Sequence, residues 1–205
     1  MVNIINKNVN TNKVNYKFFP KDKDELQQLI VMQIDKYGND VNLNNIDTSK
    51  ITDMSNLFYK PDFTGNISNW NVSNVIDMSY MFWYSNFNGD ISKWDVSNVK
   101  NMSHCFSDSG FNQDISNWDV GNVVDMNSMF VWAKFNQDIR NWNISNVIDM
   151  NLMFFKSKFN KDISNWFTKL NKKCKLSGFI RNTNINITSY TDFKQYHRRM
   201  ILSNF

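Results

Sequence analysis

Cysteine and glycine are scarce in this chain of 205 residues, and each scarcity excludes a type of site. The two cysteines, Cys105 and Cys174, cannot form a four-ligand zinc site alone, and their spacing indicates no disulfide framework. The six glycines give no G-G-x-G-x-D spacing, which a calcium-binding β-roll requires. We therefore expect no metal and no other cofactor, and a reducing compartment suits the two thiols.

Long apolar runs are missing too. No run approaches the roughly 18 residues that a membrane-spanning helix needs. The first residues, MVNIINKNVNTNKVNYKFF, lack the apolar core of a signal peptide. We expect no membrane span, no signal peptide or anchor, and an intracellular (cytoplasmic) or virion-associated protein.

Charge is nearly balanced overall, with a formal net charge of +4, but it is uneven along the chain. Residues 46–165 contain nine basic and thirteen acidic side chains, a net charge of −4. Residues 166–205 contain eight basic side chains and one acidic side chain, a net charge of +7. A mildly acidic central region therefore precedes a basic C-terminal end.

One sequence motif recurs along most of the chain. It reads FNGDISKWDVSNVKNM over 87–102, FNQDISNWDVGNVVDM over 111–126 and FNQDIRNWNISNVIDM over 135–150, with a looser copy over 63–78. A fixed short period is the signature of stacked repeats that share one continuous core. We expect the core to be built on tryptophans that recur every 24 residues: Trp70, Trp94, Trp118, Trp142 and Trp166.

Within one unit the apolar spacing changes. Trp118 and Val120 alternate with polar residues, which predicts a very short strand. Asp125 then stands where a helix N-cap would, before Met126, Met129 and Phe130 at helical spacing, which predicts a turn or two of α or 3₁₀ helix.

The chain divides into four parts on these patterns. We expect a disordered N-terminal arm over 1–15, followed by a helical cap over 16–45 whose helix covers 24–36. The C-terminal part, 166–205, is expected to form a basic cap with a terminal helix. Between the caps lie five 24-residue repeats: 46–69, 70–93, 94–117, 118–141 and 142–165.

The repeat resembles a known family. Ile91-Ser-Lys-Trp94-Asp-Val96 fits the leucine-rich-repeat pattern L-x-x-L-x-L, and the unit FNQDISNWDVSNV-x-DM-x-x-MF is similar to the atypical repeats of BspA-like leucine-rich-repeat surface proteins. The resemblance covers about 21–166. It implies an α/β repeat solenoid, a right-handed leucine-rich-repeat-like array with a short parallel β-sheet on one face and short helical or 3₁₀ turns on the other. It also implies binding or adhesion, and it supplies no catalytic residues.

Catalysis has one apparent candidate, the adjacent pair His104 and Cys105. Cys105 occupies the position of Met81 and Met129 in other units, which indicates a core residue, and neighbouring residues on a helix diverge rather than meet. No P-loop, G-x-S-x-G or H-E-x-x-H motif occurs. We expect no catalytic residues and no enzyme.

Two surfaces are candidates for binding a protein partner of unknown identity. The first is the polar face of the predicted strands, for which simple solvation is the alternative; its candidates are Asn71, Asp95, Asp119 and Asn143. The second is the variable site after each predicted helix, for which local packing between units is the alternative. Aromatic residues are enriched at interface hot spots, and this site is rich in them: Trp83, Tyr84, Val131, Trp132 and Phe155.

The basic C-terminal end is a candidate for anion binding, although no nucleic-acid-binding motif accompanies it. Its candidate residues are Lys172, Lys173, Lys175, Arg198 and Arg199. The main hypothesis is a non-enzymatic protein–protein interaction or assembly module. The alternatives are binding of nucleic acid or another anionic surface through this end, and surface adhesion like that of secreted BspA-like proteins.

Overall fold

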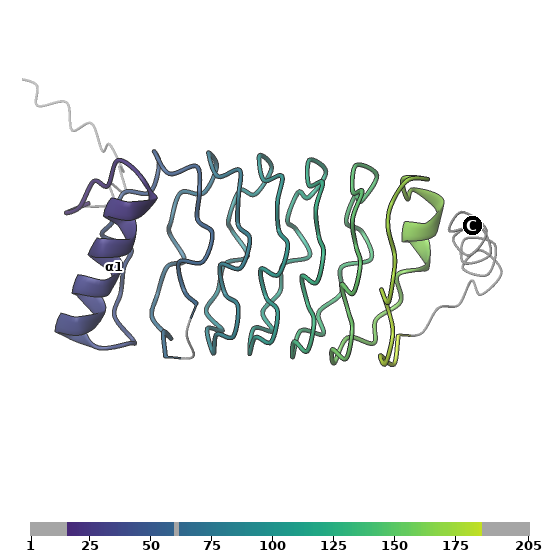
Figure 1. The fold of residues 1–205 in the computed structure, drawn as a ribbon. Helices are drawn as coiled ribbons and strands as arrows, with labels where there is room; N and C mark the ends of the chain where they lie inside the picture. The colour runs from purple at the N-terminus through teal and green to yellow at the C-terminus, as the bar shows by residue number, and fades with distance from the viewer. Residues whose placement is uncertain (1–15, 60–61, 186–205) are drawn as a thin grey trace, which may run out of the picture.

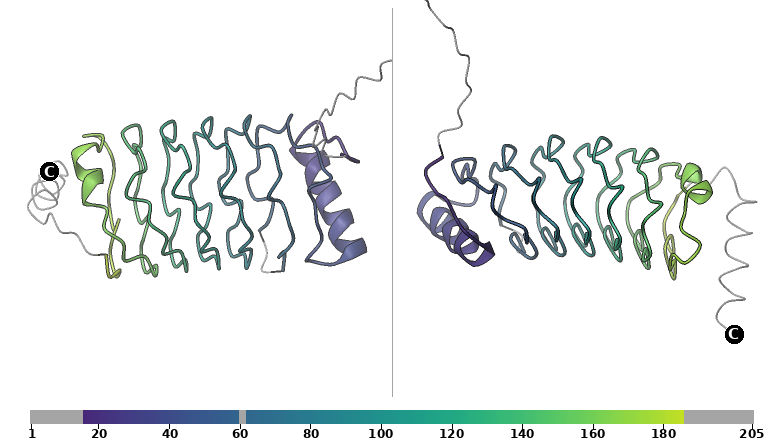
Figure 2. Two further views of the ribbon diagram at one scale, coloured as in Figure 1. Left: turned by 180° about the vertical axis from the view of Figure 1, so that it is seen from behind. Right: turned by 90° about the horizontal axis from the view of Figure 1, so that it is seen from above.

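The protein is a row of similar coils that lie side by side, with one helix across the N-terminal end (Figures 1 and 2). The structure is a computed structural model in which residues 16–59 and 62–185 are described. Within these ranges the helical elements are α1, an α-helix over Lys23–Tyr37, and η1, a 3₁₀ helix over Ser164–Thr168. The predicted disordered arm, 1–15, and the predicted terminal helix lie outside the described residues.

The predicted fold class, an α/β repeat solenoid with a parallel β-sheet, is wrong. The described residues contain no strand or sheet, and only isolated parallel β-bridges join neighbouring coils. The predicted short strand around Trp118 is a pair of turns, in which Trp118 N donates to Ile115 O at 3.1 Å and Val123 N donates to Val120 O at 3.0 Å. Two consecutive turns direct Trp118 and Val120 inward, and this imitates the alternation of a strand.

The predicted short helix after Asp125 is also wrong. Three overlapping turns replace it, in which Met129 N, Val131 N and Ala133 N each donate to the carbonyl three residues earlier at 3.1–3.2 Å. Ser128 and Trp132 have φ values of +54° and +58°, which no right-handed helix contains. The predicted cap itself is present as a side-chain turn, because Asp125 Oδ1 accepts from Asn127 N at 2.8 Å.

Backbone hydrogen bonds between coils take the place of helical bonds. In one coil, Met102 N, His104 N and Phe106 N donate to Asp125 O, Asn127 O and Met129 O of the next coil at 2.9–3.0 Å. The equivalent bonds recur at the other coil contacts, and parallel bridges join Asp77 to Asn101 and Asn101 to Asp125. Every coil therefore depends on its neighbours for its backbone partners.

The core consists of stacked aromatic rows, as the recurring tryptophans predicted. Trp94 and Trp118 stack with ring centroids 6.5 Å apart and planes 4° apart, and the indole of Trp118 donates to Ile91 O at 3.1 Å. The five tryptophans are all at least 96% buried. Two rows of phenylalanines run beside them through successive coils: Phe58, Phe82, Phe106, Phe130 and Phe154 in one, and Phe63, Phe87, Phe111, Phe135 and Phe159 in the other.

The helix predicted over 24–36 is confirmed as α1. Asp22 caps its start by accepting from Glu25 N at 3.0 Å, and Gly38, with φ +90°, ends it. Leu26 and Ile30 are buried and belong to the same hydrophobic core as the coils. The helix therefore closes the core at the N-terminal end of the row.

Candidate functional site

Aromatic side chains gather on the surface of the first three coils, and we call them the first aromatic cluster: Tyr59, Tyr80, Trp83, Tyr84 and His104. Tyr59 and Trp83 stack at 4.8 Å, and Tyr80 stacks on His104 at 4.4 Å. Tyr80 also meets the edge of Trp83 at 5.5 Å, which joins the two pairs. Tyr59, Trp83 and Tyr84 are 45%, 36% and 54% exposed, so the cluster presents aromatic surface to solvent.

A second aromatic cluster lies two coils further along and consists of Trp132, Phe155 and Lys156. The two rings meet edge to face at 6.5 Å, and Trp132 is 53% exposed. Lys156 Nζ lies 4.3 Å from the centre of the Trp132 ring and 5.4 Å from that of Phe155. An ammonium at this distance is attracted by the negative face of the rings.

The turns of the coil determine where these side chains point. Two positions in each coil have positive φ, and they hold Tyr80, Tyr84 and His104 in the first cluster and Trp132 and Lys156 in the second. Non-glycine residues rarely adopt this conformation, and only the bonds to adjacent coils maintain it here. The repeat does not require an aromatic residue at these positions, because the buried Ser128 and the exposed Asp108 occupy them elsewhere.

A row of carboxyl and amide side chains adjoins the first cluster, and we call it the acidic row: Asp53, Asp77, Asn101, Asp125 and Asp149. Lysines pair with both ends, because Lys23 Nζ lies 3.4 Å from Asp53 and Lys175 Nζ lies 3.4 Å from Asp149. In the middle, Asn101 Nδ2 donates to Asp77 Oδ2 at 3.1 Å. Within the described ranges Asp77 and Asp125 have no ion pair.

The charges of this row affect the adjacent groups. Partial burial raises the pKa of Asp125 above its usual range, and the neighbouring charge of Asp149 adds to this effect. Burial lowers the pKa of His104, while the charge of Asp125 acts in the opposite direction. His104 thus feels the charge of Asp125 and stacks on Tyr80, so it links the acidic row to the first cluster.

The four polar candidates of the predicted strand face do not lie on a sheet, since none exists in the described residues. They are exposed, and each closes a local turn: Asn71, Asp95, Asp119 and Asn143 accept from the backbone N–H two residues later at 3.0–3.3 Å. The Oδ1 atom of each of these side chains therefore already accepts a hydrogen bond within its own coil.

The aromatic candidates divide between the two clusters. Trp83 and Tyr84 belong to the first, and Trp132 and Phe155 belong to the second, where Val131 is half-buried. The sequence interpretation missed Tyr59, Tyr80 and His104. The period contained the signal, because Tyr59 and Trp83 are 24 residues apart, as are Tyr80 and His104.

The basic candidates are not brought together as one site. Lys172 and Lys173 are exposed, but Lys175 pairs with Asp149, and Arg198 and Arg199 lie outside the described residues.

Burial disfavours the thiolate of Cys105, the cysteine of the adjacent pair His104 and Cys105. Cys105 is buried in the core and burial strongly raises the pKa of its thiol, while burial also raises the pKa of Cys174 to about 12. A thiol attacks as its thiolate, so neither group is activated. In 16–59 and 62–185, no three His, Cys, Asp or Glu side chains are grouped so that they could hold a metal ion.

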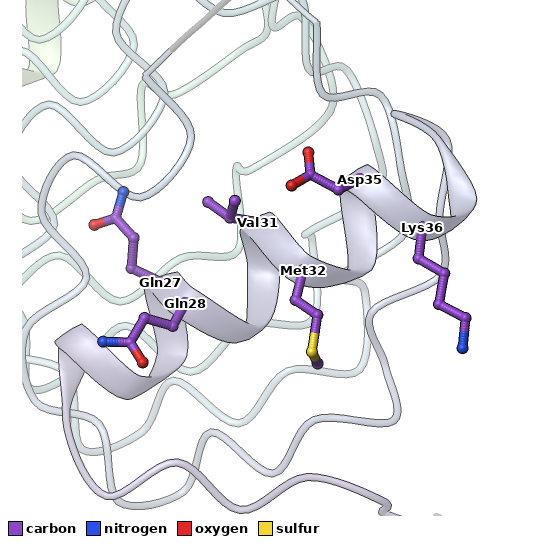
Figure 3. A pocket seen from close by; sticks show the side chains of 6 residues that line it. All are labelled: Gln27, Gln28, Val31, Met32, Asp35 and Lys36. Atoms are coloured by element: carbon purple, nitrogen blue, oxygen red, sulfur yellow. The ribbon is translucent and has the colours of Figure 1, made fainter.

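The outer face of α1 is a further exposed surface (Figure 3). Val31 and Met32 are 50% and 45% exposed and line a shallow hollow together with Gln27, Gln28, Asp35 and Lys36. All six residues belong to the one helix, and Asp35 and Lys36, although adjacent in sequence, point in different directions. No helix of the described part is long and apolar enough to cross a membrane.

The fold and the two aromatic clusters define a repeat protein. Its coils stack through internal aromatic rows, and the residues at their exposed positions differ from coil to coil. Residues 27–133 and 84–192 match the family described as "Mycoplasma protein of unknown function, DUF285". These matches cover most of the chain, so the chain belongs to this family. Of the predicted resemblance to BspA-like leucine-rich-repeat proteins, the membership of a repeat family is confirmed, and the assignment to that particular group stays a prediction. No curated protein and no solved structure shows significant similarity to the chain.

Proposed function

We propose that the chain is a non-enzymatic protein-binding module and that it binds its partner through the first aromatic cluster, with the second cluster extending the surface. One observation carries this proposal: exposed aromatic rings gather at positions where the repeat itself tolerates Ser and Asp. Aromatic residues bury much area with few rotatable bonds, so they dominate interface energetics. The shared motif also supports a relation between these repeats and those of BspA-like proteins, many of which bind other molecules.

The test is affinity capture from the native source, with wild-type protein compared with the double variant Trp83→Ala/Trp132→Ala. Tyr37→Ala is the matched control, because Tyr37 is 57% exposed and lies on α1, which contributes no residue to either cluster. We expect a protein that wild type and Tyr37→Ala retain and the double variant loses. All three proteins should first show the same melting temperature.

Two results would overturn the proposal. A partner retained equally by all three proteins would place binding elsewhere on the molecule. Recovery that disappears after nuclease treatment would indicate binding of nucleic acid, and lysines such as Lys172 and Lys173 would then be the residues to vary.

A further inference from the structure

The second aromatic cluster shows what kind of group its rings accept. Lys156 reaches over Trp132 and Phe155 although its own side chain is exposed and free to extend into water. The attraction between an ammonium and the face of an indole stabilises this arrangement. In this cluster the chain supplies the cation itself.

The first cluster offers the same kind of rings, and no cation of the described residues lies over them. Trp83 is flanked by Tyr59 and Tyr80, and Tyr84 follows it in the chain. Within 16–59 and 62–185, the cations that lie over aromatic rings are Lys36, on Tyr37, and Lys156. Tyr59 stacks on Trp83, and the 36% of Trp83 that is exposed is the part of its ring that a cation from outside the described residues could reach.

The surrounding charge favours the same kind of group. In the coils that carry the cluster, the acidic row lies three residues before it, with Asp77 before Tyr80 and Asn101 before His104. In the described ranges the lysine partners of the row are at its two ends, at Asp53 and Asp149. Residues 46–165 have a net charge of −4. This local excess of carboxylates favours a basic segment over an anionic one such as nucleic acid, although the whole chain has a net charge of +4.

We infer that the first aromatic cluster docks a lysine- or arginine-bearing segment of a partner protein, with the side-chain cation over Trp83. This inference rests on the proposed function and adds the chemistry of the partner. Carboxylates beside the rings set the sign of the charge, and the rings supply the contact area.

The seven tryptophans allow a direct test, because each gives its own indole N–H signal in an NMR spectrum. The probe is a synthetic peptide of lysines spaced by Gly-Ser pairs, and the control peptide has every lysine acetylated. We expect the lysine peptide to shift the signal of Trp83 and to leave the five buried indoles unchanged. The acetylated peptide should shift none of them, since acetylation removes the charge.

Two variants give effects of opposite sign. Trp83→Leu keeps an apolar side chain but removes the aromatic face, so the lysine peptide should bind about fivefold or more weakly. Lys156→Gln removes the internal cation, so the peptide should now also shift the signal of Trp132. Both substitutions are at exposed positions, and matching melting temperatures would confirm that each variant folds.

Several outcomes would overturn the inference. The cation would have no role if the acetylated peptide shifted Trp83 equally, or if Trp83→Leu bound the lysine peptide as tightly as wild type. A gain in binding on Lys60→Gln, at the lysine next to Tyr59 in sequence, would mean that the chain's own lysine competes for the cluster. Concentration-dependent shifts of Trp83 without peptide would assign the surface to a second copy of this chain.

Failure here is distinguishable from failure of the proposed function. If the capture experiment succeeds and the peptide experiment fails, the surface binds a protein by means other than a cation. If Trp83→Ala/Trp132→Ala retains every captured protein, the proposed function itself is wrong.

Discussion

The buried tryptophans and the exposed aromatic clusters use similar side chains in opposite ways. Inside, each coil repeats the same residue and the same geometry: Trp94 and Trp118, like Trp142 and Trp166, stack at 6.4–6.5 Å with nearly parallel planes. Outside, the residue changes from coil to coil, and the contacts include a 4.8 Å stack, an edge-to-face pair and a lysine over a ring. The 24-residue period therefore determines which residues form the buried core. The exposed residues, which do not follow the period, are the ones that can be specific to this molecule.

The largest expected effect contrasts one tryptophan from each region. Trp118→Ala should lower the free energy of unfolding by about 3–5 kcal/mol, because it leaves a cavity between two stacked coils. Trp83→Ala should change it by about 1 kcal/mol or less, since its ring is partly exposed and its contacts lie at the surface. Urea unfolding of both variants, followed by circular dichroism, measures this difference. Equal losses would contradict the division into a structural interior and a variable exterior.

A smaller effect concerns a buried position at which one coil has alanine and three other coils have serine. Ser85, Ser109 and Ser157 each accept from the backbone N–H two residues later through Oγ, at 3.1–3.3 Å. Ala133 occupies the equivalent position and is fully buried, so this bond is absent in its coil. Ala133→Ser should raise the free energy of unfolding by about 1 kcal/mol, as one net hydrogen bond does.

Thermal unfolding of Ala133→Ser, which adds the hydrogen bond, and of Ser109→Ala, which removes it, measures the effect of this bond on stability in both directions. Ser109→Ala removes a bond to a buried N–H and should destabilise by about 1–3 kcal/mol. A loss of stability in Ala133→Ser would mean that the added hydroxyl does not fit the buried site.

The smallest effect concerns the acidic row, whose side chains are partly buried at the edge of the core. The pKa of Asp125 is raised in the folded state, so its contribution to stability is present below its unfolded pKa of about 3.9 and is lost as pH rises through the folded value. Asp125→Asn removes this loss and keeps the turn, as Asn101 shows by accepting from Ser103 N at 3.0 Å. The melting temperature should rise by about one or two degrees at pH 7.

Melting curves from pH 3 to pH 8 check this sign. Near pH 3 the carboxyl group is protonated in both states, so the difference between Asp125→Asn and wild type should shrink. A variant that is more stable at pH 3 but not at pH 7 would show that the charge of Asp125 is compensated in the fold.

The sequence predicts the parts of the fold that depend on side-chain periodicity. The interval between Trp94 and Trp118 gives the stacked core, and Asp22 with Gly38 marks the ends of α1. The strand and helix inside each coil could not be read correctly, because successive turns give the same inward spacing at Trp118 and Val120 as a strand does. The positive φ of Ser128 carries no mark in the sequence, since only contact with the next coil maintains it.

The candidate site could be predicted only in part for a related reason. The aromatic residue at position 83 stands out against serine in the next coil, so Trp83 could be identified from the sequence. The stacking of Tyr80 on His104 required the register of neighbouring coils at the turn positions. The link from His104 to Asp125 depends on half-burial of both groups, which the sequence does not reveal.

The carbonyl of Ile91 accepts two hydrogen bonds, one from the backbone N–H of Trp94 and one from the indole of Trp118. One acceptor thus closes a turn in its own coil and fastens the next coil. When that next coil detaches, this turn keeps its own bond, whereas Met102 N, His104 N and Phe106 N of the inner coil lose their acceptors. Local opening should therefore advance one coil at a time, because each detached coil removes acceptors from only the coil beside it.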